Sequence, residues 1–363
     1  MTNQIRPSEK EICDQGGDLG FSIDNAVILA VGARHGHEVT EEIQFNVLRS
    51  HQKHLFLGGL KKLGLDKEES DPVRCAKFHV LSNHLGGLRV RYGEGDGKAW
   101  VVYDTPYWLD SPWSPGISQV ATRPELMYQT MGAWHGNNGV ALGNPRLVYV
   151  QTQLVAWGDA CDAGYFYEED HDVAPEDRMQ HRPEEGLPAD LKLVPADLDE
   201  AVWPILRQAK AWRNFSVAYV GGRMYWLQKT LGEEKAVEIF EYCMRVVMLQ
   251  KRERVQALYG IKGEASPQRA AALFCAWHEC LGDEVEVTNN VDGSIECVIK
   301  RSRFHEVGEF AAPGDPVPAS FEEAIHRAWA TVISYDCPGV EVVASGSMLA
   351  DQPAWTFVIR NAA

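Results

Sequence analysis

GHEVTEEIQFNVLRSH, residues 36–51 of the chain, returns in related form as GEEKAVEIFEYCMRVV at residues 232–247. The two segments open a longer correspondence, in which residues 36–102 align with residues 232–298 at a constant offset of 196 and without a gap. Fifteen of the aligned positions are identical, whereas chance matching at average residue usage would give about four. We therefore infer a tandem duplication, so that each residue of one copy can be compared with its counterpart in the other.

Length, charge and cysteine usage limit the kind of protein this is, and 363 residues are enough for two domains of ordinary size. A net charge of −16 disfavours nucleic acid and anionic membrane surfaces as partners, because both attract basic proteins. Residues 1–10 lack the apolar run of a secretory signal, and the longest apolar run, residues 26–33, is too short to cross a bilayer. The eight scattered cysteines are typical of reduced thiols. We therefore expect a cytoplasmic protein with no nucleic-acid and no membrane partner.

The apolar pattern predicts the same series of elements in each copy. In the second copy a long amphipathic helix runs from about residue 231 to residue 258 and ends at a glycine, and a shorter helix covers residues 268–281. A hairpin with an Asp-Gly turn follows over residues 285–299, and then a helix that ends near Trp329 and a second hairpin. Each copy is therefore expected to be α+β, with helices packed on a small antiparallel sheet.

The boundaries of the repeats follow from composition. Residues 168–202 are acidic and rich in proline, which predicts an exposed linker. Each repeat opens with an apolar segment of strand or helix character, residues 21–33 or residues 215–222. The predicted organisation is a polar lead-in over residues 1–20, a first repeat over residues 21–167, a linker over residues 168–202, and a second repeat over residues 203–363 that begins with a short helix at residues 203–212.

The end of the first repeat resembles a known family. A strand over residues 147–150 is followed by Gly158-Asp159-Ala160-Cys161 and an aromatic strand. This ending is similar to that of 4-vinyl reductase-like domains and of the related L-2-amino-thiazoline-4-carboxylate hydrolases, in which a long helix, a shorter helix and a hairpin also come first. The resemblance implies a small-molecule site and, for the hydrolases, the ring opening of a small cyclic amidine acid; sister domains bind small aromatics or serve as sensors. The corresponding segment of the second repeat, residues 351–355, contains no cysteine.

Histidines distinguish the two repeats. Because duplicated proteins often keep their chemistry in one half, histidines found only in the first repeat mark it as the candidate active unit. Arg34-His35-Gly36 resembles the start of a histidine phosphatase, and His35-x-His37 resembles a metal pair of an amidohydrolase barrel, but the duplication disfavours both. His51 and His54 lie one helical turn apart and could share a ligand or a metal. Six histidines of the first repeat align with a residue other than histidine in the second repeat: His35, His37, His51, His54, His79 and His84.

Aromatic residues gather in the second half of the first repeat, and we expect the loop from Thr105 to Ile117 to cover a pocket there. His135 follows Trp134 as Ala330 follows Trp329 in the second repeat, which makes His135 the candidate general acid or base. Cys161 is a candidate nucleophile, with a buried hairpin thiol as the alternative. The predicted site consists of catalytic His135, Cys161 and Asp159 and of substrate-binding Tyr107, Trp108, Trp113, Trp134, His51 and His54.

These residues predict a small-molecule enzyme that cleaves a C–N bond by hydrolysis or opens the ring of a small cyclic or conjugated substrate. A lyase or isomerase could use the same acid–base pocket, and a non-catalytic small-molecule sensor is a third reading. In the second repeat, Cys275, His278 and Cys280 are zinc-capable, but no second ligand pair lies at the usual spacing, which favours buried thiols. The substrate, any cofactor or metal, and a homodimeric state are left open by the sequence.

Overall fold

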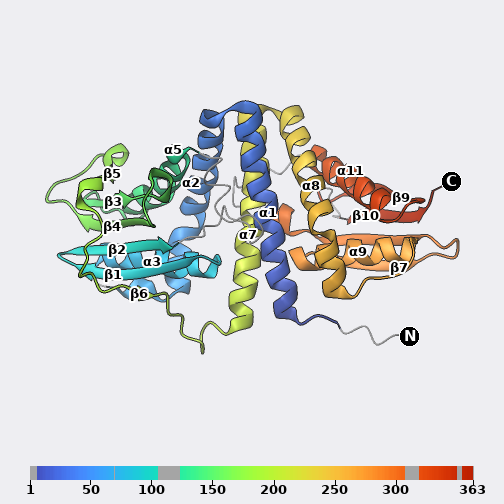
Figure 1. The fold of residues 1–363 in the computed structure, drawn as a ribbon, viewed down its shortest axis with the longest axis horizontal. Helices are drawn as coiled ribbons and strands as arrows, with labels where there is room; N and C mark the ends of the chain where they lie inside the picture. Colours follow the sequence, from blue (N-terminus) through green and yellow to red (C-terminus); the bar gives the residue numbers. More distant parts are fainter. Residues whose placement is uncertain (1–5, 69, 105–122, 307–318, 350–353, 363) are drawn as a thin grey trace. The chain divides into compact units, whose positions relative to one another are not determined.

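The computed structural model describes residues 6–68, 70–104, 123–306, 319–349 and 354–362 (Figure 1). The chain divides into two compact units, one formed by residues 31–204 and the other by residues 1–30 together with residues 205–363. Among the described residues, no helix combines the length and the apolar composition that crossing a membrane requires.

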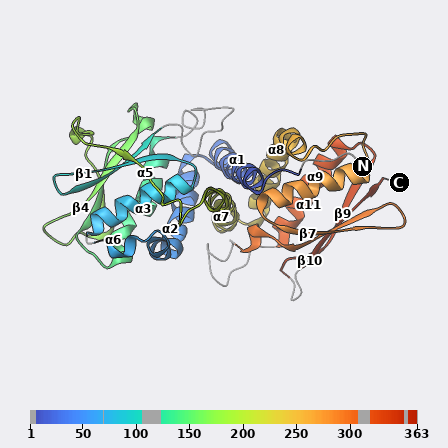
Figure 2. The ribbon, with the colours of Figure 1, turned by 90° about the horizontal axis from the view of Figure 1, so that it is seen from below.

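The 31–204 unit consists of helices on one face of a six-stranded sheet. Its main elements, in chain order, are α2 (His37–Lys62), η1 (Leu65–Lys67), α3 (Asp71–Leu85), β1 (Arg89–Gly95), β2 (Lys98–Asp104), α5 (Pro124–Trp134), η2 (His135–Asn137), α6 (Asn138–Leu142), β3 (Leu147–Gln153), η3 (Val155–Trp157), β4 (Asp162–Glu168), η4 (Pro175–Asp177), β5 (Met179–His181), η5 (Pro183–Glu185) and β6 (Val194–Pro195). The sheet order is β5-β3-β4-β2-β1-β6, and β5 alone runs parallel to its neighbour. α3 lies against β1, β2 and β4, while α5 lies against α2 (Figure 2).

Local sequence signals explain the first hairpin of this unit. The turn between β1 and β2 places Asp96 and Gly97 at φ 51° and 73°, and Asp-Gly is among the pairs that adopt such positive φ values readily. The hairpin predicted from alternation is therefore confirmed. Its strands bury Val90, Val101 and Tyr103 in the core.

Residues 168–202 are largely exposed, as their composition predicted, but the segment also adds two short strands to the sheet. β5 pairs with β3 and β6 pairs with β1, so this segment extends both edges of the sheet. Leu187 and Leu191 pack against Trp100, Val150 and Tyr165, which lie on the face of the sheet away from α3. The two strands are only three and two residues long, which is compatible with a segment rich in proline.

The other unit consists of α1 (Glu9–His35) up to residue 30, followed by α7 (Ile205–Leu231), α8 (Glu233–Tyr259), α9 (Pro267–Leu281), β7 (Glu284–Asn289), β8 (Ile295–Arg301), α11 (Ala319–Asp336), β9 (Val340–Ser347) and β10 (Ala354–Asn361). Its antiparallel sheet has the order β7-β8-β10-β9. The core centres on Phe274, Trp277, Trp329 and Phe357, all of which are fully buried.

Two segments of this unit are more helical than the sequence predicted. The polar lead-in belongs largely to α1, and the short helix and apolar segment expected at residues 203–222 form one helix, α7. Small residues of α1 allow the two helices to approach closely: a Cβ at Gly20 would lie 2.4 Å from Ser216 Oγ, and a Cβ at Gly17 would lie 2.6 Å from the Trp212 ring. This packing outweighs the low helix propensity of glycine.

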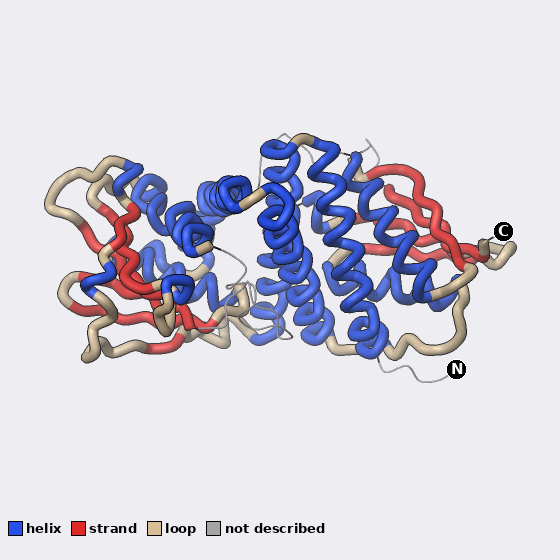
Figure 3. Tube along the Cα trace, turned by 45° about the horizontal axis from the view of Figure 1, so that its top comes forward, coloured by secondary structure: helices blue, strands red, loops and turns tan. Residues whose placement is uncertain are grey.

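The two units have the same order of elements. Along the chain, α1 and α2 precede a shorter helix, a hairpin, a further helix and a second hairpin, and α7 and α8 precede the same series, although most of α1 belongs to the 1–30/205–363 unit. The sheet order β3-β4-β2-β1 also corresponds strand by strand to β9-β10-β8-β7. Figure 3 shows helices and strands as separate layers within each unit, which is the predicted α+β class.

Candidate functional site

A stacked pair of histidines lies between α3 and the sheet of the 31–204 unit. The rings of His79, on α3, and His135, at the start of η2, have centroids 3.7 Å apart and are inclined by 13°. Phe166 of β4 lies under both rings, with centroids at 5.5 and 5.6 Å, and the Tyr149 ring of β3 lies 4.4 Å from His135. All four side chains are buried.

Hydrogen bonds assign the tautomer of His135. Its Nδ1 lies 3.2 Å from the carbonyl oxygen of Met131, so Nδ1 carries the hydrogen and donates it. Its Nε2 lies 2.9 Å from Tyr103 Oη and therefore accepts the phenolic hydrogen. Asn83 Nδ2 donates to the same phenol oxygen over 3.3 Å. His135 is thus a neutral imidazole that holds the Tyr103 hydroxyl in one orientation.

Burial keeps both imidazoles uncharged. Desolvation lowers the pKa of His135 to about 3, against a smaller raising effect of the Met131 carbonyl. The pKa of His79 is also lowered well below its usual value, first by burial and then by the neighbouring His135. His79 Nε2 accepts a hydrogen bond of 2.7 Å from Asn138 Nδ2, and Gln52 Nε2 donates to Asn138 Oδ1 over 3.3 Å. A pKa near 3 is far from the value near 7 that suits a general base, which is the role that the sequence suggested for His135.

Three polar atoms on the same face of the sheet have no hydrogen-bond partner among the described residues: Tyr149 Oη, Gln151 Oε1 and Asp162 Oδ2. Cross-strand register places them together, because Gln151 lies two residues after Tyr149 on β3 and Asp162 pairs with Tyr103. All three side chains are fully buried. Buried polar groups almost always have partners, so these three atoms mark this face as a candidate site for a ligand or for ordered water.

Gly164 makes room for one of these groups. It pairs with Gln151, and a Cβ added to it would lie 2.4 Å from Tyr149 Oη and 2.4 Å from the Val150 carbonyl oxygen. Because Val150 O belongs to the backbone, the clash could not be relieved by a side-chain rotation. Glycine at position 164 therefore allows the Tyr149 hydroxyl to lie flat against β4.

Asp162 is the carboxyl group best suited to proton transfer in this cluster. Burial raises its pKa to about 8, although the backbone N–H of Val155, 2.7 Å from Oδ1, lowers it in part. A carboxyl group with such a pKa is largely protonated at neutral pH and can both donate and accept a proton near that pH.

The raised pKa of Asp162 has a consequence for stability. In the unfolded chain an aspartate has a pKa of about 3.9, so the contribution of the protonated carboxyl is complete below about pH 4 and is lost as the pH rises toward about 8. Each pH unit in this window costs up to about 1.4 kcal/mol. We expect Asp162→Asn, which cannot ionise, to gain stability relative to the wild type as the pH is raised.

Urea denaturation of both proteins at about pH 5 and at about pH 8 measures this difference. The Asn variant keeps an oxygen that can accept the Val155 N–H, so its fold is retained. A constant difference between variant and wild type at the two pH values would contradict a raised pKa.

The structure does not bring Cys161 to His135. Cys161 packs with Val102 and Ala163 on the opposite face of the sheet from Tyr103 and Asp162, because neighbouring residues of a strand alternate between faces. Burial raises the pKa of its thiol, which disfavours the thiolate. The position matches the buried hairpin thiol that was the alternative reading of the sequence.

The remaining predicted residues are scattered. Asp159 Oδ2 accepts the backbone N–H of Leu154 over 2.8 Å and closes the β3–β4 loop. Trp134 stacks on Phe78, with ring centroids 5.8 Å apart, and meets His79 edge-on. On α2, His51 is buried whereas His54 is exposed, so the two do not share one site. The predicted loop residues Tyr107, Trp108 and Trp113 lie outside the described residues.

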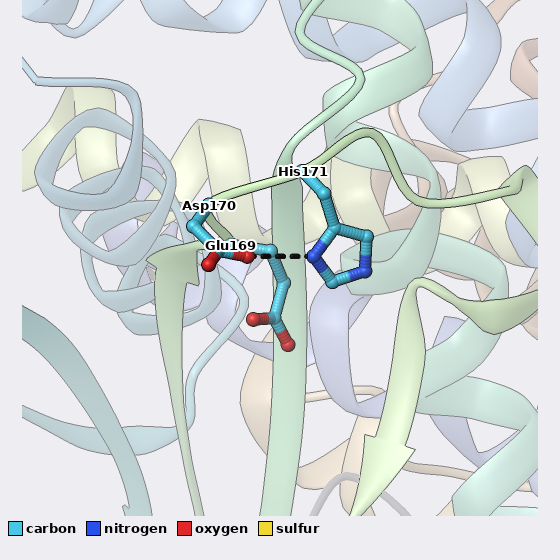
Figure 4. A group of neighbouring side chains, drawn as sticks. All are labelled: Glu169, Asp170 and His171. Atoms are coloured by element: carbon cyan, nitrogen blue, oxygen red, sulfur yellow. Dashed lines mark hydrogen bonds and ion pairs between the residues drawn. The ribbon is translucent and has the colours of Figure 1, made fainter.

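Two groups of residues that could ligate a metal ion lie outside this cluster. His278 has both ring nitrogens engaged, Nδ1 with Asp283 at 2.6 Å and Nε2 with the indole N–H of Trp329 at 3.2 Å, so it is not available to a zinc ion beside Cys275. After β4, Glu169, Asp170 and His171 place a ligand atom each within 4.8 Å of one another (Figure 4). His171 and Asp170 are exposed, and the Glu169 carboxylate already accepts from Tyr167 and Arg182.

Sequence reasoning predicted His135 as a site residue and noted His79 among the histidines of the first repeat, but it missed Tyr103 and the buried polar atoms of Tyr149, Gln151 and Asp162. Strand alternation was the available signal: in the β4 segment it places Asp162 on the face of Gly164 and Phe166, and Cys161 on the other. The resemblance directed attention to Asp159 and Cys161 instead. Comparison of the chain with protein-family models, with curated proteins and with solved structures finds no match.

Proposed function

We propose that the 31–204 unit is a small-molecule enzyme that hydrolyses a C–N bond in a small cyclic or conjugated substrate. The observation that carries the proposal is the set of buried, unpartnered polar atoms on Tyr149, Gln151 and Asp162 beside the Tyr103–His135 hydrogen bond. A ligand with both donors and acceptors would satisfy these atoms, and the surrounding rings would hold its flat part. The resemblance to the aminothiazoline carboxylate hydrolases supports a cyclic amidine as the substrate class.

In this proposal, Asp162 is the proton donor. Its protonated carboxyl gives a proton to the ring nitrogen as water adds to the amidine carbon; as the C–N bond breaks and the added oxygen becomes the carbonyl oxygen of the product, one proton of the water restores the carboxyl and the other completes the released amine. Tyr103, oriented by His135 and Asn83, would hydrogen-bond the substrate, and Tyr149 would do the same from β3. His135 acts as a positioning residue through Tyr103, which is a different role from the proton shuttle that the sequence suggested.

A direct test uses 2-amino-thiazoline-4-carboxylate as the probe. Incubation with the full chain is expected to give a product whose mass equals that of the probe plus one water, detected by mass spectrometry. Tyr103→Phe should weaken turnover, because it removes a hydroxyl from the site. Tyr165→Phe, the same change on the opposite face of the same sheet, should leave turnover unchanged.

A non-catalytic sensor is the second candidate, because the two imidazoles are neutral and already partnered. It predicts that the probe raises the unfolding temperature of the chain without being consumed. A product of the same mass as the probe would instead indicate an isomerase. If the chain neither binds cyclic amidine acids nor turns them over, the proposed substrate class is rejected.

The two units are also proposed to descend from one duplicated unit. The gapless alignment at offset 196 and the equal order of strands in the two sheets support this proposal. The polar atoms of the candidate site belong to the 31–204 unit alone: the positions aligned with His79 and Tyr103 are Cys275 and Ile299. We therefore assign the reaction to one unit.

A further inference from the structure

Two thiols of the 1–30/205–363 unit face each other between its shorter helix and its sheet. Cys275 lies on α9 and Cys297 on β8, and their Sγ atoms are 4.0 Å apart. Cys297 is fully buried, whereas Cys275 is partly exposed. Both are free cysteines in the structure.

The pair stands where the other unit has its histidine cluster. At the offset of 196, Cys275 aligns with His79, and Cys297 aligns with Val101, a buried residue two positions before Tyr103. Cys297 pairs across the sheet with Val287 and Phe357, so it points to the face that Phe357 shares with Phe274 of α9. The thiols therefore join a helix to the sheet beneath it.

We propose that Cys275 and Cys297 form a reversible intramolecular disulfide when the protein meets a peroxide. The Cys275 sulfur attacks one peroxide oxygen, the O–O bond breaks, and a sulfenic acid and water are formed. The Cys297 sulfur then attacks the sulfenic sulfur, the S–O bond breaks, and a second water leaves as the S–S bond forms. The peroxide is reduced by two electrons and the two thiols are oxidised together.

Geometry supports the order of the two steps. Cys275 is the thiol that solvent can reach, and the buried Cys297 is positioned to resolve its oxidised form. The Cys297 thiol, 4.0 Å from the Cys275 sulfur, lowers the pKa of Cys275 and favours its thiolate. A disulfide needs a sulfur separation of about 2.05 Å, so the sulfurs must close by roughly 2 Å through side-chain rotation with a small shift of α9.

The test begins with the full-length wild type, treated with an equimolar amount of hydrogen peroxide. Thiol titration after denaturation should then show two fewer free thiols than the eight in the sequence. Cleavage after glutamate separates the relevant cysteines, because Glu279, Glu284 and Glu296 lie between Cys275, Cys280 and Cys297. Peptide mapping without reductant should show the Cys275 and Cys297 peptides joined, and dithiothreitol should separate them.

Variants show whether the pair is specific. Cys275→Ser and Cys297→Ser should each form no cross-link, whereas Cys280→Ser, on the same helix, should form it as the wild type does. Burial raises the pKa of Cys280 to about 12, so this thiol makes a suitable inert control. A cross-link to Cys280, or oxidation of Cys275 to a sulfinic acid while Cys297 stays free in the wild type, would overturn the proposal. The outcome does not depend on the function proposed for the 31–204 unit.

Discussion

Asp24→Asn is expected to lower the free energy of unfolding of the 1–30/205–363 unit by about 3–5 kcal/mol. Asp24 of α1 and Arg223 of α7 form a bidentate ion pair, with Nε–Oδ1 at 2.8 Å and Nη2–Oδ2 at 3.0 Å. Both side chains are at most 1% exposed. Removing the carboxylate leaves a buried guanidinium without its counter-charge, and Arg223 Nη1 already has no hydrogen-bond partner among the described residues. Urea denaturation monitored by circular dichroism measures the change.

Asp14→Asn is the matched control on the same helix. Asp14 pairs with Lys10 over 2.5 Å, but the two side chains are 34% and 44% exposed, so the pair is worth at most about 1 kcal/mol. Replacing Asp24 and Arg223 together by Leu and Met should recover most of the stability lost in Asp24→Asn, because no buried charge remains. If Asp24→Asn lowers the free energy of unfolding no more than Asp14→Asn does, the Asp24–Arg223 ion pair between α1 and α7 is not a main source of stability in this unit.

The α1–α7 contact also explains where sequence reasoning failed on the fold. The long helix, the shorter helix and the two hairpins predicted in each copy are present, whereas the apolar segment at residues 21–33, predicted as strand or helix, belongs to α1. Residues 9–20 contain Gly16, Gly17 and Gly20, which by propensity argue against a helix. A Cβ at Gly16 would lie 1.9 Å from the carbonyl oxygen of Cys280. These glycines are therefore required by a close approach between distant segments, which local sequence does not reveal.

The candidate site was predictable only in part, for a related reason. His135 stood out because the residue after the matching Trp329 of the second repeat is alanine, and the structure places His135 in a buried hydrogen-bonded cluster. Asp162 did not stand out, because its raised pKa is caused by burial, and the neighbouring strands that bury it are not evident from the local sequence. Cys161 was assigned to the same site from its place in a motif, although strand alternation puts it on the other face of the sheet. The position of Cys161 in the motif therefore gave the wrong site, whereas the alternation of side chains along the strand would have placed it on the other face.

Asp162→Asn should reduce turnover of a cyclic amidine acid by about 10²- to 10⁴-fold, the usual contribution of a positioned proton donor. This expectation rests on the function proposed for the 31–204 unit. Asn keeps the shape of the side chain and the acceptor for the Val155 N–H, but it has no carboxyl proton to give. The rate constant for turnover, followed by the appearance of the hydrated product, should therefore fall while the protein remains folded.

Asp159→Asn is the control that separates proton donation from loop closure. Asp159 and Asp162 each accept one backbone N–H of the same β3–β4 loop, from Leu154 at 2.8 Å and from Val155 at 2.7 Å. If the loop alone mattered, the two variants would lose activity equally. The proposal requires that Asp159→Asn stays within a few-fold of the wild type, and that Asp162→Asn loses activity while gaining relative stability at alkaline pH. A variant that gains stability has not lost its activity by unfolding. That combination therefore identifies the Asp162 proton as the reacting group.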